Sequence, residues 1–573
     1  MNEAKSNPLL RFMPSLTDVA FLMPILFLFL RLDGAKMMLG DGDTGVHIRT
    51  GEWILANGRV PDQDFYSFTK PGQPWFAWEW LWDVIFGWMH QHWGMAAVVV
   101  VNILLISVTC ALLYRLVRRK CGNVLLAIGV TFLAVAGSSI HWLARPHLFT
   151  LLFVVIFYSM LERVREGRVR LLIGLPFLTV LWTNLHGGFF VGITLICIYA
   201  AGELAAWAVE RVAEERRAAL ARSKLYLLSA GACLLASLVN PYWYHLHVHI
   251  WQYLRDPFQF RTITEFLSLS FQHPTARYLE AMIVLGVVAA AWNLYRRQFV
   301  YTFLIAGWLH LALVSARNIP IFMIVAAPPA ALAIEELLAL LREARVVGWV
   351  RKAIQGFEDL GGEFGAADRL ARFPLTSLAA ALLLIALFYI PTGSSKLTAE
   401  YDPKSYPARA LEALQAAGST KAIFTDDEWG DYLVYRLYPK SKVFIDGRSD
   451  FYGATFTEKY IDVLNGKHDW EKTLEHYGVE TVLLHADACL ASTLKESRRW
   501  RVTYDDGIAI AFRCAALAQM VARAEGPEGA QVSAAAGSGV FRGLQITNPN
   551  NPEPGRLPKP ARLTNLNARR KPA

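Results

Sequence analysis

Two aspartates, two residues apart, are the residues of this sequence best placed to do chemistry. Asp41 and Asp43 lie in the stretch Gly40-Asp-Gly-Asp-Thr-Gly-Val-His47, directly after the first membrane-length apolar run. A carboxylate beside a membrane is costly to strip of water, so it must be solvated, paired or bound to a ligand. One interpretation is that Asp43 has no chemical role and is the N-cap of a short helix over residues 44–57, which Gly58 would end. Alternatively, the pair marks an active site in which Asp43 is a general base.

Other charged residues lie in loops that the sequence places on the same side of the membrane. Glu79 follows Asp43 in the first loop, and Arg145, His186 and Arg317 lie in three later loops. Cations near helix ends commonly reach for lipid headgroups, which is one interpretation of these residues. The other is an anion site beside the base: the base takes a proton from an acceptor hydroxyl, while the cations hold a phosphate leaving group. On that interpretation Arg145, Arg317 and His186 are the candidate phosphate ligands.

The same two aspartates could instead bind a metal. Carboxylates at positions i and i+2, with His47 close by, suit a divalent ion such as Mg²⁺ or Mn²⁺, which would replace some of the cations around a phosphate. A second possibility involves His245, His247 and His249, which share one face only if they lie in a strand. The six cysteines show no metal-binding spacing.

Four residues are candidates for contacts with a second substrate. Asp64 lies in the first loop, His245 opens a later loop, and Asp446-Gly-Arg448 follows a predicted strand near the C-terminal end. The Asp446-Gly-Arg448 segment forms either a turn with a salt bridge or a contact with an acceptor above the membrane. For His245 an interaction with lipid headgroups is the alternative.

Composition sets the class of protein. Of 573 residues, 54% are hydrophobic and only 18% are charged, and the mean hydropathy is +0.30. A soluble domain usually has about 25% charged residues. The net charge of +9 comes mainly from Lys and Arg in alternate loops, and no basic soluble face precedes the last 50 or so residues, which argues against nucleic-acid binding. These values predict a polytopic helical membrane protein.

About eleven apolar segments are predicted as membrane helices, and several of them are short. They are Asp18–Met38, Ala96–Leu116, Asn123–Leu143, His147–Leu161, Leu171–Leu185, Phe189–Ala208, Leu225–Asn240, Arg277–Leu294, Phe299–Val314, Ile319–Leu340 and Phe373–Ile390. Alternate loops carry the clusters of Lys and Arg, which places the N-terminus in the cytoplasm and residues 40–94 outside. In the outer loop, residues 75–93 are rich in aromatics and predict a helix at the membrane interface, with Glu79 and Asp83 on one stripe. The expected location is a bacterial inner membrane.

The membrane part is expected to cover residues 1–392 and a periplasmic α/β domain residues 397–515. Strands are predicted at 421–425, 442–446, 481–485 and 508–513, and helices at 407–417, 428–437, 456–464 and 469–477. Cys489 and Cys514 in this domain could form a disulfide. Residues 526–573 are rich in Gly, Pro, Asn and basic residues, which predicts a disordered tail.

The first outer loop has a distinctive order of residues. A membrane helix is followed by Asp43 and a helix ending at Trp53-Ile-Leu-Ala-Asn-Gly58, and then by Pro74-Trp-Phe-Ala-Trp-Glu-Trp80. This order resembles the first outer loop of the GT-C superfamily of glycosyltransferases, which includes aminoarabinose transferases and protein O-mannosyltransferases. In that family the acidic residue matching Asp43 is implicated in catalysis. The family's second carboxylate is not at its usual position here, although Asp41 completes an Asp-x-Asp similar to that of other branches.

The resemblance implies a function and its partners. The donor would be a polyprenyl- or dolichyl-phosphate-linked sugar, the acceptor a lipid, glycan or protein, and the transfer inverting. Asp43 would be the base, with Asp41 or Glu79 as its partner. The rival hypotheses are a lipid or glycan transporter or flippase without catalysis, and a scaffold that has lost activity. Ionisable residues are nearly absent from the predicted helices, which argues against a transporter.

Overall fold

The computed structural model describes residues 11–344, 347–371, 373–391 and 393–515. The disordered tail predicted for residues 526–573 lies outside this range. In the membrane part the helices are α1 (Leu16–Arg31), α2 (Ala35–Met38), α3 (Asp43–Asn57), α4 (Trp80–Lys120), α5 (Val124–Ser138), α6 (His147–Arg165), α7 (Gly174–Leu185), α8 (Phe190–Val209), α9 (Ala213–Ala236), α10 (Tyr244–Arg255), α11 (Pro257–Thr262), α12 (Ala276–Tyr295), α13 (Phe299–Val314), α14 (Ile319–Glu343), α15 (Gly348–Asp368) and α16 (Leu375–Tyr389). Short 3-10 turns connect several of them, namely η2 (Ser139–His141), η3 (Val169–Ile173), η4 (Gly187–Phe189), η5 (Thr264–Phe266) and η6 (Ala316–Asn318).

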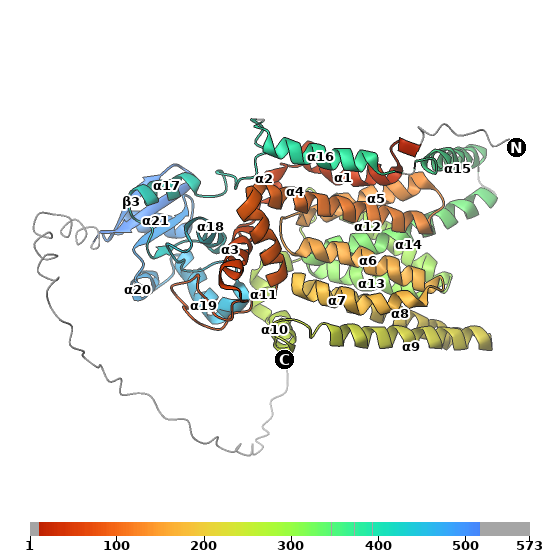
Figure 1. Cartoon of the computed structure of the whole chain (residues 1–573), viewed down its shortest axis with the longest axis horizontal. Helices are drawn as coiled ribbons and strands as arrows, with labels where there is room; N and C mark the ends of the chain where they lie inside the picture. Colours follow the sequence, from red (N-terminus) through yellow and green to blue (C-terminus); the bar gives the residue numbers. More distant parts are fainter. Residues whose placement is uncertain (1–10, 345–346, 372, 392, 516–573) are drawn as a thin grey trace, which may run out of the picture. The chain divides into compact units, whose positions relative to one another are not determined.

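The chain is a helical membrane protein. Seven helices of the described residues are long and apolar enough to cross a bilayer: α4, α5 with η2, α6, α8 with η4, α9, α12 and α14 with η6. They lie side by side in Figure 1. Seven is fewer than the eleven predicted, because four of the predicted segments form short helices. The 16 residues of α1 and of α13 rise about 24 Å, less than the roughly 30 Å of a hydrocarbon core.

The first outer loop confirms the predicted short helix and corrects the interface helix. Helix α3 begins at Asp43 and ends at Asn57, where Gly58 takes the left-handed conformation (φ +66°) that ends the helix. The aromatic segment becomes helical only at Trp80 and continues as α4 into the membrane. A break at Gly94 (φ +71°) separates its surface part from its membrane part. Glycine tolerates this conformation because it lacks a Cβ atom.

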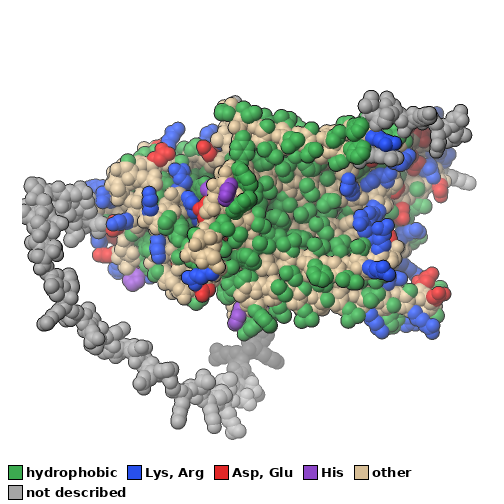
Figure 2. Space-filling model, viewed as in Figure 1, with side chains coloured by type: hydrophobic (Ala, Val, Ile, Leu, Met, Phe, Trp, Pro, Cys, Tyr) green, Lys and Arg blue, Asp and Glu red, His purple; other side chains and the backbone are tan. Residues whose placement is uncertain are grey.

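Charge is sorted between the two ends of the bundle. Figure 2 shows a wide hydrophobic band bordered on one side by Lys and Arg. There the last turns of α4, α6 and α8 meet through ion pairs: Lys120 Nζ lies 3.5 Å from Glu166, and Arg165 Nε lies 3.8 Å from Glu203. The loops that carry Arg145 and Arg317 precede α6 and α14, so they lie at the opposite end of these helices.

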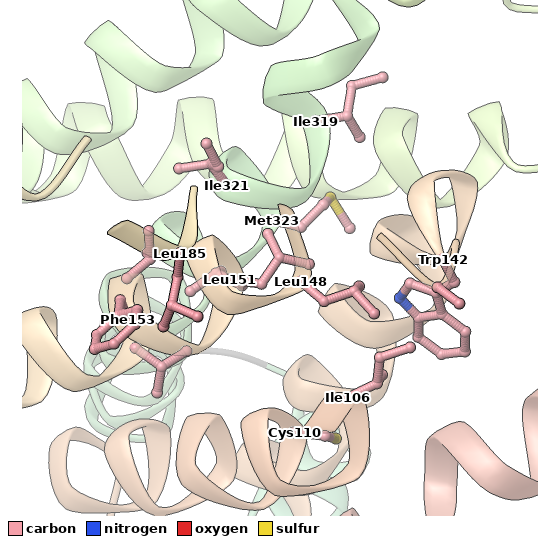
Figure 3. Close-up of a cluster of buried hydrophobic side chains, with 14 of the residues drawn as sticks. Ile106, Cys110, Trp142, Leu148, Leu151, Phe153, Leu185, Ile319, Ile321 and Met323 are labelled. Atoms are coloured by element: carbon pink, nitrogen blue, oxygen red, sulfur yellow. The ribbon is translucent and has the colours of Figure 1, made fainter. Parts of the chain in front are cut away.

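The bundle core supports the loop that carries Arg145. Figure 3 shows Trp142, which precedes this loop, and Leu148, which follows it, in one buried cluster with Ile106 from α4 and Met323 from α14. Trp142 and Leu148 are each 1% exposed. Burial of such large apolar side chains stabilises a fold by roughly 2–3 kcal/mol each, so the position of Arg145 is set by packing on both sides of it.

The C-terminal part is a small α/β domain whose sheet has the strand order β1-β2-β4-β3. Strand β1 runs parallel to β2, and β4 is antiparallel to both β2 and β3. Its elements are α17 (Ala408–Ala416), β1 (Ile423–Phe424), α18 (Asp427–Leu437), α19 (Ser449–Leu464), α20 (Trp470–His476), β2 (Thr481–His485), α21 (Cys489–Glu496), β3 (Trp500–Asp505) and β4 (Ala509–Cys514). Cys489 and Cys514 are free in the structure, not bonded to each other.

The segment 442–446 is not a strand, contrary to the prediction. Val443 forms single bridges with Ser67 of the first loop and with Ile423. Its backbone is therefore used to join the first loop to the C-terminal domain rather than to extend the sheet.

Helix α18 packs on α3, and two glycines make the close contact possible. A Cβ atom on Gly42 would lie 2.6 Å from the Glu428 carbonyl oxygen, and one on Gly45 would lie 2.5 Å from the Cβ of Tyr435. Arg49 Nε adds a hydrogen bond to the Tyr435 carbonyl at 2.7 Å. The C-terminal domain thus holds α3, and with it Asp43, in a fixed position.

Candidate functional site

A cavity of about 940 Å³ lies between the C-terminal domain and the ends of the membrane helices that carry the Arg145 and Arg317 loops. Its wall brings together residues from the first loop, from the loops before α6, α8 and α14, and from α10, α11 and α18. The predicted site residues that line it are Asp41, Asp43, Glu79, Arg145, His186, Arg317 and Arg448. Asp64, His245 and Asp446 are not part of its lining.

Arg145 joins the two aspartates of the opening motif. Its Nη1 atom lies 2.6 Å from Asp41 Oδ2, and its Nη2 atom pairs with Asp43 Oδ2. The Asp43 backbone N–H donates to Asp41 Oδ1 at 2.9 Å, which satisfies a free donor at the start of α3. Thr44 Oγ1 donates to the Ala144 carbonyl at 3.2 Å and fastens α3 to the Arg145 loop. The N-cap of α3 is Gly42, so Asp43 is not the N-cap that the sequence allowed. Asp43 is the first residue of the helix and lines the cavity.

Glu265 connects Arg145 to Arg317. One of its oxygens lies 3.3 Å from Arg145 Nη1, and the other accepts a hydrogen bond from Arg317 Nε at 2.9 Å. Burial alone would raise the pKa of Glu265, but Arg145 and Arg317 outweigh it and hold that pKa well below its usual range. Glu265 is thus an ionised carboxylate between the two cations.

His47 is surrounded by three carboxylates. Its Nδ1 atom lies 2.7 Å from Asp83 Oδ1, and its Nε2 atom lies 3.2 Å from Glu79 Oε2 and 3.7 Å from Asp43 Oδ2. Asp43 and His47, four residues apart, therefore face each other along one side of α3. Burial opposes protonation of His47, but Asp83 and Asp43 raise its pKa well above the usual value. The ring is an imidazolium that holds the neighbouring carboxylates in place.

His186 contacts the other side of Glu79. The Gly188 backbone N–H donates to His186 Nδ1 at 2.9 Å, and the Thr150 hydroxyl lies 2.7 Å from the same atom. Since Nδ1 accepts, the ring proton is on Nε2, which lies 3.3 Å from Glu79 Oε1. Burial, followed by Arg317 and Arg145, lowers the pKa of His186 well below its usual value. The neutral ring can donate a hydrogen bond to Glu79, but it offers no charge to a phosphate.

The carboxylates of the cavity differ in proton affinity. Burial would raise the pKa of Asp43, but Arg145 and His47 hold it well below the usual range. Burial raises the pKa of Glu79 to about 7, with Asp83 and Asp43 adding to the rise and His47 opposing it. Burial also raises the pKa of Asp41, against the attraction of Arg145. Of these three groups, Glu79 is the one poised to exchange a proton near neutral pH.

Asp64, Asp446 and Arg448 form a buried network behind the cavity wall. Arg448 Nη2 lies 2.7 Å from both Asp64 Oδ1 and Asp446 Oδ2, and its guanidinium stacks 4.4 Å from the Trp75 ring. Arg448 is 7% exposed. This geometry matches the salt-bridge interpretation of the motif and ties the first loop to the C-terminal domain. His245 is exposed and stacks on Tyr244 at the start of α10, away from the cavity lining.

The aspartate pair is a poor fit to a metal site. Arg145 already forms ion pairs with both carboxylates, and among the described residues no three His, Cys, Asp or Glu side chains are grouped to hold an ion. The histidines at 245, 247 and 249 lie in a helix rather than a strand, so they do not converge. The metal at Asp41 and Asp43 stays a prediction.

The cavity lining also includes ionisable residues that were not predicted as site residues, among them Glu265 and Asp431. Glu265 gave no signal, since it lies in an unremarkable loop sequence before α12. Asp431 on α18 is 2% exposed and accepts a hydrogen bond from the Gly447 backbone N–H at 2.8 Å. The segment Trp429-Gly-Asp-Tyr432 was a usable signal, because it places an acid on the same helix that packs against α3.

No protein-family model matches the chain, and no curated protein matches it in sequence. The side chains around the cavity offer a carboxylate poised to take a proton, a pair of guanidinium groups able to bind an anion, and an apolar wall.

Proposed function

We propose that this protein is a membrane glycosyltransferase of GT-C type, which transfers a sugar from a polyprenyl-phosphate-linked donor to an acceptor at the outer face. The observation that carries the proposal is one cavity lined by Glu79, Asp43, Arg145 and Arg317 at the loop end of the bundle. When a hydroxyl displaces a phosphate, the reaction requires a group that accepts the hydroxyl proton and cations that bind the departing phosphate.

The cavity suits a lipid-linked phosphate in particular. Arg145 and Arg317 can each donate to phosphate oxygens, and guanidinium groups favour such charged, directional contacts. Beside them the wall is apolar, with Leu311 and Val314 from α13 and Ile321 from α14. Leu311 and Val314 are 38% and 47% exposed, so this wall continues to the outer surface of the bundle. A polyprenyl chain would lie along it.

The proposed reaction is a single displacement at the anomeric carbon. The acceptor hydroxyl gives its proton to Glu79 as its oxygen bonds to that carbon. The bond from carbon to phosphate oxygen breaks, and its electron pair leaves with the phosphate, which Arg145 and Arg317 stabilise. The sequence predicted Asp43 as the base, but its low pKa makes it a poor proton acceptor. We assign it a different role, in which its negative charge stabilises the cation-like sugar of the transition state.

The membrane orientation belongs to the same proposal. All eleven predicted segments would cross the membrane. A helix shorter than the hydrocarbon core can do so when the bilayer thins around it or when its flanking polar side chains extend to the interface. The Lys and Arg end of the bundle would face the cytoplasm of a bacterial cell, and the cavity and the C-terminal domain the periplasm.

A reconstituted assay tests the proposal. The protein in proteoliposomes is supplied with polyprenyl-phosphate sugars and an envelope extract as acceptor, and free polyprenyl phosphate is measured by mass spectrometry. Release that needs the wild-type protein and is lost in Glu79→Gln supports the proposal. Movement of intact sugar-lipid across the bilayer without release of polyprenyl phosphate would instead identify a flippase.

A further inference from the structure

Glu265 is bound to both guanidinium groups that the proposed function assigns to the donor phosphate. It accepts from Arg317 Nε at 2.9 Å and lies 3.3 Å from Arg145 Nη1. Its side chain is 22% exposed and lines the cavity. Two oxygens of a phosphate could bridge the same pair of donors, so Glu265 occupies the place that such a group would take.

The positive charge at this place does not suffice for both Glu265 and a bound phosphate. Arg145 already pairs with Asp41 and Asp43, and Arg317 has Glu265 as its ion-pair partner. A phosphate added beside Glu265 would bring two negative groups within a few ångströms in a partly desolvated cavity. The repulsion between two anions is strong in such a cavity, because its effective dielectric is lower than that of water. Binding of a phosphate therefore requires that Glu265 release the arginines.

The backbone at Glu265 is fixed, which leaves the side chain as the moving part. Ser315 Oγ donates to the Glu265 carbonyl at 3.1 Å, and the Ala316 backbone N–H donates to the Leu267 carbonyl at 2.9 Å. The neighbouring Phe266 is 6% exposed, and Arg317 lies over its ring at 4.6 Å. A rotation of the Glu265 side chain can free the arginines without opening the loop, and rotamer changes of partly exposed side chains are fast.

We infer that Glu265 is the resident counter-ion of the phosphate site: it holds Arg145 and Arg317 in the empty cavity, yields them to the phosphate of an isoprenyl lipid, and takes them back when the phosphate product leaves. The inference rests on the proposed function, because it assumes that these arginines bind the donor phosphate. Because Glu265 competes for the arginines, it lowers the affinity of the site for both the donor and the phosphate product, and so it favours their exchange.

Binding of a short isoprenyl phosphate tests this role directly. The full-length protein in detergent is titrated with farnesyl phosphate, and with farnesol as the uncharged match, by calorimetry. Glu265→Gln should bind farnesyl phosphate about tenfold more tightly than the wild type, since loss of one charged competitor is worth about 1.5 kcal/mol or more. Farnesol binding should not change. Glu280→Gln, an exposed acid on the first turns of α12, is the matched control and should bind like the wild type.

The outcomes separate the inference from the function beneath it. If Glu265→Gln binds farnesyl phosphate no more tightly than the wild type while Arg317→Gln weakens binding, the phosphate site stands and the counter-ion role is wrong. If the wild type does not distinguish farnesyl phosphate from farnesol, and Arg317→Gln does not alter binding, the proposed function itself fails. Should Glu265→Gln not fold, Glu265→Asp serves in its place, since the shorter side chain cannot bridge both arginines and should also bind the phosphate more tightly.

Discussion

His186 Nε2 lies 3.3 Å from Glu79 Oε1, and this contact joins the residue that follows α7 to the residue that precedes α4. On its other side Glu79 faces His47 Nε2 at 3.2 Å. The His186 ring is neutral and the His47 ring is charged, so Glu79 faces one neutral and one charged hydrogen-bond donor. The carboxylate is therefore held in one orientation while its second lone pairs face the cavity, as a general base requires.

Glu79 should control the pH dependence of transfer. A base must be ionised, and the pKa of Glu79 is raised to about 7, so kcat/KM should rise with pH through about 7 and level off above it. Glu79→Gln should lower kcat by about 10²–10⁴-fold and remove this rise. A pH–rate profile of both proteins checks the prediction. An unchanged profile in Glu79→Gln would assign the proton to another group.

Asp43→Asn should change the reaction differently from Glu79→Gln. The negative charge of Asp43 raises the pKa of Glu79, so its removal favours the ionised form of Glu79. The midpoint of the pH–rate profile should move below that of the wild type, with a lower kcat. Asp41→Asn is the matched control, because it removes the neighbouring carboxylate that pairs with the same arginine. Loss of all pH dependence in Asp43→Asn would restore Asp43 as the base.

Arg317 should act on the donor rather than on the acceptor. Arg317→Gln removes a charged donor to the phosphate, and truncation of such a contact costs about 2 kcal/mol or more, roughly a thirtyfold loss in kcat/KM for the lipid donor. Arg277→Gln, an exposed arginine on α12, should leave this ratio unchanged. Steady-state kinetics with varied donor and then varied acceptor separate the two. An effect confined to the acceptor would place the phosphate elsewhere.

Arg448 should be needed for stability, not chemistry. Arg448→Gln leaves Asp64 and Asp446 buried without their shared partner, and breaking a buried ion pair costs about 3–5 kcal/mol. The thermal midpoint of the purified protein should fall, whereas Arg409→Gln on the exposed side of α17 should leave it unchanged. A stable Arg448→Gln protein that had lost acceptor turnover would favour the other interpretation, in which this motif binds the acceptor.

The parts of the site that follow from local spacing could be predicted, and the parts made by tertiary contacts could not. Asp43 and His47 are four residues apart on a helix that ends before Gly58, so the sequence spacing places them on the same helix face. Glu265 reaches Arg317 over 52 residues through the packing of η5 against η6, and it reaches Arg145 over 120 residues; no periodicity encodes either contact. In the fold, long apolar runs predicted the bundle. Strand β3 was missed although its sequence, Trp-Arg-Val-Thr-Tyr-Asp, alternates apolar and polar residues as a strand does; most of its residues are exposed at the edge of the sheet.

The release of free polyprenyl phosphate from a polyprenyl-phosphate sugar is the measurement that tests the central claim most directly. Proteoliposomes with the wild-type protein, with Glu79→Gln and with no protein receive the same lipid-linked sugars and envelope acceptors. The account predicts release by the wild type alone, with residual release from Glu79→Gln at least about a hundredfold lower. Equal release from all three preparations, or from wild type and Glu79→Gln alike, would contradict it.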